Sequence, residues 1–517
     1  MKKLISLLCA LCILFTFVAC ANVADEGGEE TTTPAAVADT DAPAETPDSG
    51  ATEGSGDTVE PQRPSAFESA EKQDLEKYVF TIRYADFDDC YSDFHSEGLN
   101  GNVLNDAVYE RNMLVEEALN MSIDISWDAY TAVNESVKTQ VNAGDHSYDL
   151  FASQRTCLAL SYGGYLYNMK DIPSLRLDKE WWDQGYINTM TVNDKLFTVV
   201  GDISVASLLF VSSLTFNKRL IESYGLQVPY DTVRENKWTF DAMKTLLANT
   251  SQDLNNDGQL TPGDDIYSLI GWGSESGYSL FYSTGYKFMN RNSSGDMVLE
   301  YDAERFISVI EKVRELWDPM STYFNNGSGR EQHAATWKIF ADGQAVCADI
   351  VLSKIGTYFM DMPDDYGIVP LPKFDEAQED YVTYSGFTVP MLMIPANEQN
   401  TERTGIIMEA LGSASYDNVT PKLLEIVTKV KNVRDEDSSE MINVIIRTKI
   451  VDTAHFFDLP GYGSISRTLI ASPATNPASS IKAYKNTAEK QPERNEKNRQ
   501  RSNRKDRIQH IYRKIKP

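Results

Sequence analysis

Residues 77–127, KYVFTIRYADFDDCYSDFHSEGLNGNVLNDAVYERNMLVEEALNMSIDISW, are the stretch that decides the fold. Tyr78–Ile82 is β-branched and aromatic, which predicts a first strand. Residues 105–120 place Val108, Val115 and Leu119 on roughly one face and predict a helix, and residues 121–127 alternate like a second strand. A strand, a helix and a strand in this order predict an α/β protein with a parallel sheet.

The same alternation continues along the chain. Thr239 is the expected N-cap of a helix that Lys237–Asp241 opens. Trp238 and Trp317 lie in amphipathic helical patterns and are expected in the core. Further strands are expected at residues 145–150, 195–202, 208–216, 345–352 and 366–372, and further helices at 133–141, 303–317, 405–416, 421–430 and 440–450.

The first 20 residues resemble a bacterial lipoprotein signal peptide. Lys2 and Lys3 precede an apolar run from Leu4 to Val18, which is too short to span a bilayer comfortably. The run ends in Phe17-Val18-Ala19-Cys20, similar to a lipobox, although Phe17 replaces the usual Leu. This resemblance implies lipidation of Cys20; the alternative is a cysteine in an ordinary secretory signal. We expect an extracytoplasmic protein anchored to the outer face of the cell membrane through this lipid only.

Residues 21–65 contain Ala, Thr, Glu, Asp, Gly and Pro with hardly any large apolar side chain. Such a composition predicts a disordered acidic tether. The folded part is expected at residues 66–480, which is long enough for one large domain or two medium ones. Cys90, Cys157 and Cys347 lack metal-ligand spacing and are expected to be packed thiols.

The formal net charge of −28 argues against nucleic acid as a partner. Residues 481–517 depart from this trend, because residues 482–517 contain 13 Lys and Arg against 4 Asp and Glu. One interpretation is a basic arm that contacts anionic lipid or wall polymer. The other is a solvated, disordered tail or an aberrant C-terminus.

Several short segments together resemble the family 1 extracellular solute-binding proteins of ABC importers. Their order and spacing carry the resemblance over nearly all of residues 77–480, although each segment alone is short. The segments are Tyr148-Asp149-Leu150, Gly164-Tyr165-Leu166, Trp181-Trp182, Leu214-Thr215-Phe216-Asn217-Lys218, Lys237-Trp238-Thr239-Phe240, Phe340-Ala341-Asp342-Gly343-Gln344-Ala345 and Tyr366-Gly367-Ile368-Val369-Pro370-Leu371-Pro372.

The resemblance implies a two-lobed, periplasmic-binding-protein-like fold of type II, with the solute in a cleft between lobes joined by a hinge. By resemblance, one lobe contains about 77–205 and 368–398, and the other contains about 206–367 and 399–480. It also implies a permease partner, to which the loaded protein delivers a solute that we expect to be a sugar or oligosaccharide. A peptide or another polar metabolite is an alternative solute, because one fold hosts many ligands.

Residues 253–265, DLNNDGQLTPGDD, match the opening half of an EF-hand-type calcium loop. Oxygen atoms at alternate positions suit calcium, and a glycine is expected at the sixth position. The predicted ligands are Asp253, Asn255, Asp257, Gln259 through its carbonyl, and Asp264 in place of the usual Glu. The ion would be structural. The alternative is a surface turn without metal, since the same residues dominate turns.

Sugar sites combine aromatic rings with polar side chains near strand ends. The candidate ligand-binding residues chosen on this basis are Gln154, Arg155, Trp182, Asp202, Trp272, Asp349 and Tyr384. Of the pair Trp181 and Trp182, one could be buried and one could face the cleft.

The sequence contains no H-E-x-x-H, no G-x-S-x-G and no Walker A motif, so we expect a binding protein and no catalytic residue. The alternative is a secreted, lipid-anchored glycoside hydrolase or lyase, because sequence spacing does not exclude two carboxylates that converge across a cleft. A lipid-anchored adhesin would predict repeats or β-rich modules, which the sequence does not show.

Overall fold

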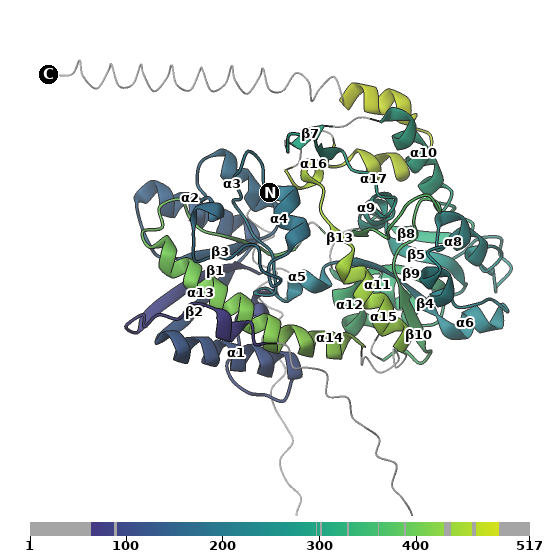
Figure 1. The fold of residues 1–517 in the computed structure, drawn as a ribbon. Coiled ribbons are helices and arrows are strands. Elements are labelled where there is room, and N and C mark those ends of the chain that lie inside the picture. Colours follow the sequence, from purple (N-terminus) through teal and green to yellow (C-terminus); the bar gives the residue numbers. More distant parts are fainter. Residues whose placement is uncertain are drawn as a thin grey trace, which may run out of the picture. The chain divides into compact units, whose positions relative to one another are not determined.

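The computed structural model describes residues 64–86, 90–295, 297–299, 302–327, 330–359, 361–386, 389–428, 436–457 and 462–484. Cys20, the signal segment, nearly all of the predicted tether and most of the basic tail lie outside these residues. Two main sheets form the folded part, one at the left and one at the right of Figure 1. We call the first sheet with its helices the first lobe, and the second sheet with its helices the second lobe.

The first sheet has the order β12-β3-β1-β2. Its strands β1, β2 and β3 are parallel, and β12 joins β3 in the antiparallel direction. Helices α1 and α2 pack on this sheet, as the strand–helix alternation predicts. The elements are β1 (Tyr78–Ala85), α1 (Val103–Leu119), β2 (Met121–Asp128), α2 (Tyr130–Ala143), β3 (Leu150–Ser153), α3 (Ala159–Tyr162), α4 (Gln184–Met190), β12 (Met391–Met393) and α13 (Thr401–Ala414).

The second sheet has the order β10-β4-β9-β5-β8. Strand β5 is parallel to β8 and β9, whereas β4 is antiparallel to β9 and β10. The elements up to β8 are α5 (Ala206–Leu209), β4 (Ser212–Asn217), α6 (Lys218–Ser223), α7 (Tyr230–Arg234), α8 (Phe240–Leu247), β5 (Tyr267–Trp272), α9 (Gly273–Ser283), β6 (Met289–Arg291), β7 (Met297–Leu299), α10 (Ala303–Arg314) and β8 (Thr322–Asn325). The later elements are α11 (Arg330–Ala341), β9 (Ala345–Val351), α12 (Leu352–Tyr358), β10 (Tyr366–Val369), β11 (Thr383–Tyr384), α14 (Thr420–Thr428), α15 (Glu436–Arg447), β13 (Lys449–Ile450), α16 (Thr453–Phe456) and α17 (Ile465–Ile470).

The chain crosses between the lobes through segments that lie side by side. The bridge between Val211 and Ser385 joins two of them, and the Ser385 amide donates to the Ile450 carbonyl of a third at 3.0 Å. A further crossing follows α13, where residues Ser415–Val419 form a π-helical turn before α14 begins. Such turns mark points where an α-helix is locally interrupted.

A buried arginine anchors two of these crossings to the first lobe. Arg111 is completely buried, and its guanidinium donates to the Ser415 hydroxyl (2.8 Å), the Ile203 carbonyl (3.3 Å) and the Asp93 carbonyl (2.6 Å). The Asp93 carboxylate in turn accepts from the Ser204 hydroxyl and from the Ala206 amide at 2.9 Å. We call Asp93 and Arg111 with these partners the hinge anchor.

The lobes divide the chain differently from the predicted boundaries. Strand β10 pairs with β4, and the Lys373 amide donates to the Trp238 carbonyl, so the chain returns to the first lobe only after residue 384, not at residue 368. Helix α13 was expected in the second lobe but packs in the core of the first. The cause is its apolar face, on which Ile407 and Leu411 are fully buried.

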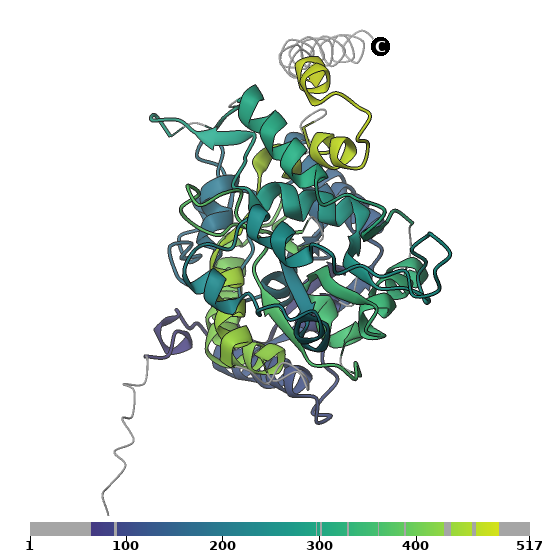
Figure 2. The ribbon, with the colours of Figure 1, turned by 90° about the vertical axis from the view of Figure 1, so that its right-hand side faces the viewer.

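The fold extends beyond the expected end at residue 480. Residues 477–484 are helical, and Ile481 is fully buried in the core of the second lobe. Helix α17 packs on α9 and α10 in the same lobe. Figure 2, in which the second lobe faces the viewer, shows this yellow C-terminal segment at the top. The prediction of a tail from residue 481 onward is therefore wrong for residues 481–484.

Several predictions about single residues are confirmed, whereas one predicted strand is partly wrong. Thr239 is confirmed as an N-cap, because its hydroxyl accepts from the Ala242 amide, and Trp238 is buried. Cys157 and Cys347 are buried free thiols, as expected, whereas the Cys90 side chain lies outside the described residues. The strand expected at 208–216 is wrong in its first half, because α5 occupies residues 206–209 after the Asp93 carboxylate fixes the Ala206 amide.

Candidate functional site

The parallel strands of both sheets end at the region between the lobes. In the first sheet β1 and β3 end at Ala85 and Ser153, and in the second sheet β5 and β9 end at Trp272 and Val351. Ligands of α/β proteins bind outside the carboxyl ends of such strands. Contact across the region is direct, because Arg155 just after β3 donates from Nη1 to the His455 carbonyl at 3.1 Å.

Charged side chains surround this contact. We call Arg155, Glu275, Asp349, Tyr384, His455 and Arg467 the inter-lobe cluster, because electrostatic interactions link them to one another. Arg155 comes from the first lobe, and Glu275 from the start of α9 in the second. Both lobes therefore contribute charge to one region.

Burial changes the protonation of the two carboxylates in this cluster. Burial raises the pKa of Glu275 to about 7; Arg467 and Arg155 favour its charged form, and Asp349 disfavours it. Burial also raises the pKa of Asp349 to about 6, against a hydrogen bond of 2.6 Å that its Oδ2 accepts from the Ser279 hydroxyl. Carboxylates with raised pKa values near a specific charged partner, as Glu275 is near Arg467 and Arg155, are typical of functional sites.

An aromatic wall backs the cluster. The ring of Tyr384 stacks on Tyr282 with centroids 5.3 Å apart, and its hydroxyl lies 2.9 Å from Nε2 of His455. The Nδ1 atom of His455 lies 2.8 Å from the Gly463 carbonyl, so Nδ1 carries the proton and Nε2 accepts from Tyr384. Burial and the charge of Arg155 lower the pKa of His455 to about 3, so this imidazole is neutral at physiological pH.

A cavity of about 310 Å³ lies beside the hinge anchor and is lined from both lobes. Ser92 and Asp93 line it from the first lobe, Phe210 from a crossing, and Ser353 and Lys354 from α12. Hydroxyl, ammonium and aromatic groups thus face one space, which is the mixture that polar ligands require.

The structure brings several of the predicted ligand residues together. Arg155, Asp349 and Tyr384 all belong to the inter-lobe cluster, although Tyr384 is fully buried by the aromatic wall. Gln154 precedes Arg155 and is buried at the end of β3. Trp272 is 8% exposed and its ring contacts His333 with centroids 3.7 Å apart.

Two predicted residues lie elsewhere. Trp182 is 1% exposed, and its Nε1 donates to Glu409 at 3.0 Å inside the core of the first lobe. The suggestion that one of Trp181 and Trp182 faces the cleft is wrong, because both are buried. Asp202 accepts from the Thr420 hydroxyl at 2.9 Å and joins two crossings. Its placement is that of a hinge residue.

Sequence reasoning missed Glu275, His455 and Arg467. A signal for Glu275 existed, because it is a carboxylate three residues after the end of a buried strand in the run GWGSESGY, from which only Trp272 was chosen. No comparable signal marks Arg467, since only the packing of α17 against α9 brings it near.

Comparison with solved structures shows the same architecture. MalE from Xanthomonas citri matches with a TM-score of 0.53 and 12% identity, covering 79% of this chain and 96% of that one. The GacH receptor of Streptomyces glaucescens matches with a TM-score of 0.51 and 13% identity, over 80% of this chain and 98% of that one. A cyclo/maltodextrin-binding protein matches with a TM-score of 0.52 and 13% identity, over 80% of this chain and 97% of that one. The chain has the two-lobed solute-binding fold. No family model and no curated protein matches the sequence.

In the predicted calcium loop, the side-chain oxygens accept hydrogen bonds from the loop's own backbone amides. The Asp253 carboxylate accepts from the Gly258 amide at 2.8 Å, and Asn255 and Asp257 accept from the amides two residues further on. Asp265, not the predicted Asp264, closes the loop by accepting from the Leu254 and Thr261 amides. Among the described residues, no three or more His, Cys, Asp or Glu side chains converge as a metal site.

Asp349→Asn tests the electrostatics of the inter-lobe cluster. The raised pKa means that folding favours the protonated form, so this residue's contribution to stability is full below pH 4 and is lost as the pH rises through about 6. Relative to the variant, the wild type should lose up to about 3 kcal/mol of unfolding free energy between pH 4 and pH 7. Urea unfolding of both proteins at several pH values in this range measures their unfolding free energies. Parallel plots of unfolding free energy against pH would contradict a raised pKa of Asp349.

Proposed function

We propose that this chain is an extracytoplasmic solute-binding protein that captures a sugar or oligosaccharide between its lobes and delivers it to an ABC transporter permease. The observation that carries the proposal is the contact of Arg155 with the His455 carbonyl where the strands end, beside Glu275 of the second lobe, whose charged form Arg155 favours. A solute bound there contacts both lobes, so binding favours their closure.

The chemistry of the region suits a polyhydroxylated ligand. Arginine and carboxylate groups donate to and accept from hydroxyls, and aromatic faces stack on the apolar faces of sugar rings. The comparison proteins support the same ligand class, since one is described in complex with acarbose and another with maltotetraose. The fold supports capture without chemical change of the solute.

The alternative of a glycoside hydrolase or lyase has weaker support. Such enzymes place two carboxyl groups on opposite sides of the scissile bond. The two carboxylates of the inter-lobe cluster, half-buried Glu275 and buried Asp349, both belong to the second lobe, and Asp349 is already bonded to Ser279. We therefore assign the cluster to binding.

We further propose that Cys20 carries a lipid and that the segment predicted as a tether, residues 21–65, links the folded part to the outer face of the membrane. Support comes from the lipobox-like Phe17-Val18-Ala19-Cys20 and from the composition of the following segment. Within the described part of the chain, every helix is too short or too polar to cross a bilayer.

Isothermal titration calorimetry with malto-oligosaccharides, starting with maltotetraose, tests the binding function. We expect saturable 1:1 binding that weakens at least about tenfold in Arg155→Ala and in Glu275→Gln, because each loses a charged hydrogen bond of about 1.5–3 kcal/mol. Glu315→Gln, on the surface of the second lobe, is the matched control and should bind normally. No heat with any sugar, or equal affinity in all variants, would reject the sugar assignment.

We also propose Ca²⁺ as a structural ligand of residues 253–265, on the basis of the oxygen-only donor set. Asp253→Asn keeps the oxygen that accepts from Gly258 but removes the charge that the ion needs. Calcium at about 100 times its Kd should raise the wild-type unfolding temperature by a few degrees over EDTA, and that of the variant much less. Identical unfolding temperatures in calcium and EDTA would show that the loop is a metal-free turn.

A further inference from the structure

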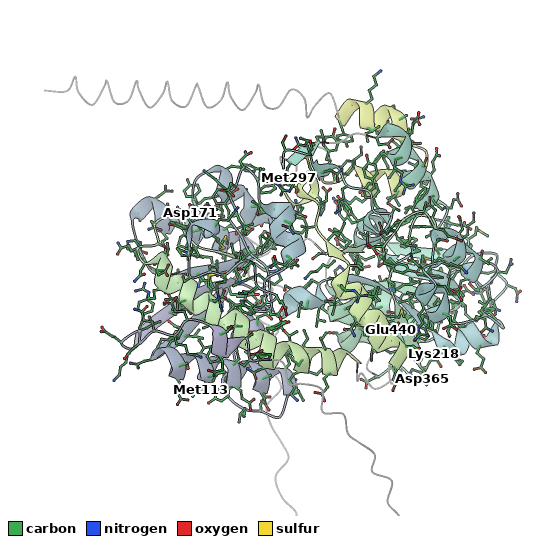
Figure 3. The ribbon with its side chains drawn as sticks, viewed as in Figure 1. Met113, Asp171, Lys218, Met297, Asp365 and Glu440 are labelled. Carbon is green, nitrogen blue, oxygen red and sulfur yellow. The ribbon has the colours of Figure 1, made fainter. Side chains whose placement is uncertain are left out.

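A small hairpin of the second lobe contacts the first lobe. Strands β6 and β7 pair from Met289↔Leu299 to Arg291↔Met297, and Met289 and Leu299 pack on the core of the second lobe. The residue before the hairpin, Phe288, is fully buried, and its amide donates to Asp452 at 2.9 Å. The hairpin is therefore rooted in the second lobe, and Figure 3 labels Met297 upon it.

The arginine of this hairpin bonds to the other lobe. Arg291 donates from Nη2 to the Thr191 carbonyl at 2.9 Å and to the Asn188 carbonyl. Both carbonyls lie at the C-terminal end of α4, whose Tyr186 and Met190 are buried in the core of the first lobe. Carbonyls at this end of a helix carry partial negative charge, which favours a guanidinium.

Helix α4 receives two further contacts from the segment that starts at β13. Lys449 pairs with Asp183, the N-cap of α4, at 2.7 Å, and the Thr453 hydroxyl donates to the Thr189 carbonyl at 3.1 Å. Helix α4 is thus the element of the first lobe on which the hairpin and the β13–α16 segment converge.

The contact at Arg291 is polar and remains open to solvent. A cavity of about 580 Å³ lies beside it, lined by Ile187 and Asn188 of the first lobe and by Arg291 and Ser294 of the hairpin. Separation of the hairpin from α4 would expose little apolar surface. The free energy needed to separate them therefore comes mainly from breaking the hydrogen bonds of Arg291 to the α4 carbonyls. Such a contact is suited to forming and breaking as the lobes move.

We propose that Arg291 is a latch: its hydrogen bonds to α4 hold the second lobe against the first and shift the equilibrium between open and closed lobes toward the closed form. Arg291 is a positioning residue, since it acts through the lobe equilibrium and lies outside the inter-lobe cluster. The inference rests on the proposed function for its biological meaning, because an easier closure means tighter retention of solute. Its test requires no solute.

The test measures the distance between the lobes in the full chain. Spin labels on keto amino acids introduced at positions 171 and 365 avoid the cysteines; both sites are exposed, and Figure 3 labels them on opposite lobes. Arg291→Ala should move the distance distribution toward longer values, with the closed population reduced about three- to tenfold. Arg291→Lys keeps a hydrogen-bond donor, so its closed population should lie between those of the wild type and of Arg291→Ala.

Arg219→Ala is the matched control, because Arg219 bonds to Asp364 within the second lobe at 2.7 Å. It should leave the distribution unchanged. A wild-type distribution in Arg291→Ala, or an equal shift in Arg219→Ala, would overturn the latch. Unfolding temperatures of all variants separate opening from loss of fold. Failure of sugar binding with a persistent Arg291 effect would reject the proposed function and leave the latch standing.

Discussion

The burial of Arg111 is the constraint on which the arrangement of the lobes depends. A guanidinium removed from water is tolerated only when its donors are satisfied. Here the partners come from three separate parts of the chain, the Asp93 carbonyl, the Ile203 carbonyl and the Ser415 hydroxyl. Because Ile203 and Ser415 stand at the start of two crossings, satisfying this one side chain fixes where both crossings leave the first lobe.

The inter-lobe cluster follows from that geometry. With the crossings fixed, the carboxyl ends of both sheets face one region, and Arg155 meets the segment that carries His455. Burial in this region raises the pKa of Glu275 to about 7 and that of Asp349 to about 6. Charges held in such surroundings interact strongly with a polar ligand that replaces water. The latch at Arg291 acts on the same lobe movement from a distance.

The sequence predicts those parts of the fold that depend on local pattern. The strand at Tyr78 and the N-cap at Thr239 depend on neighbours within a few residues, and both are present. Trp182 shows the limit of such reasoning, because its burial depends on Glu409, 227 residues further along the chain. The same holds for α13 and Arg467, whose positions are set by long-range packing that no local period reveals.

The central claim is that the two lobes close on a carbohydrate that they release unchanged. Small-angle X-ray scattering of the full chain with and without saturating maltotetraose, followed by recovery of the sugar, tests it most directly. The account predicts a smaller radius of gyration with sugar present and an intact tetrasaccharide afterwards. An unchanged radius with sugar demonstrably bound, or recovery of shorter sugars, would contradict it.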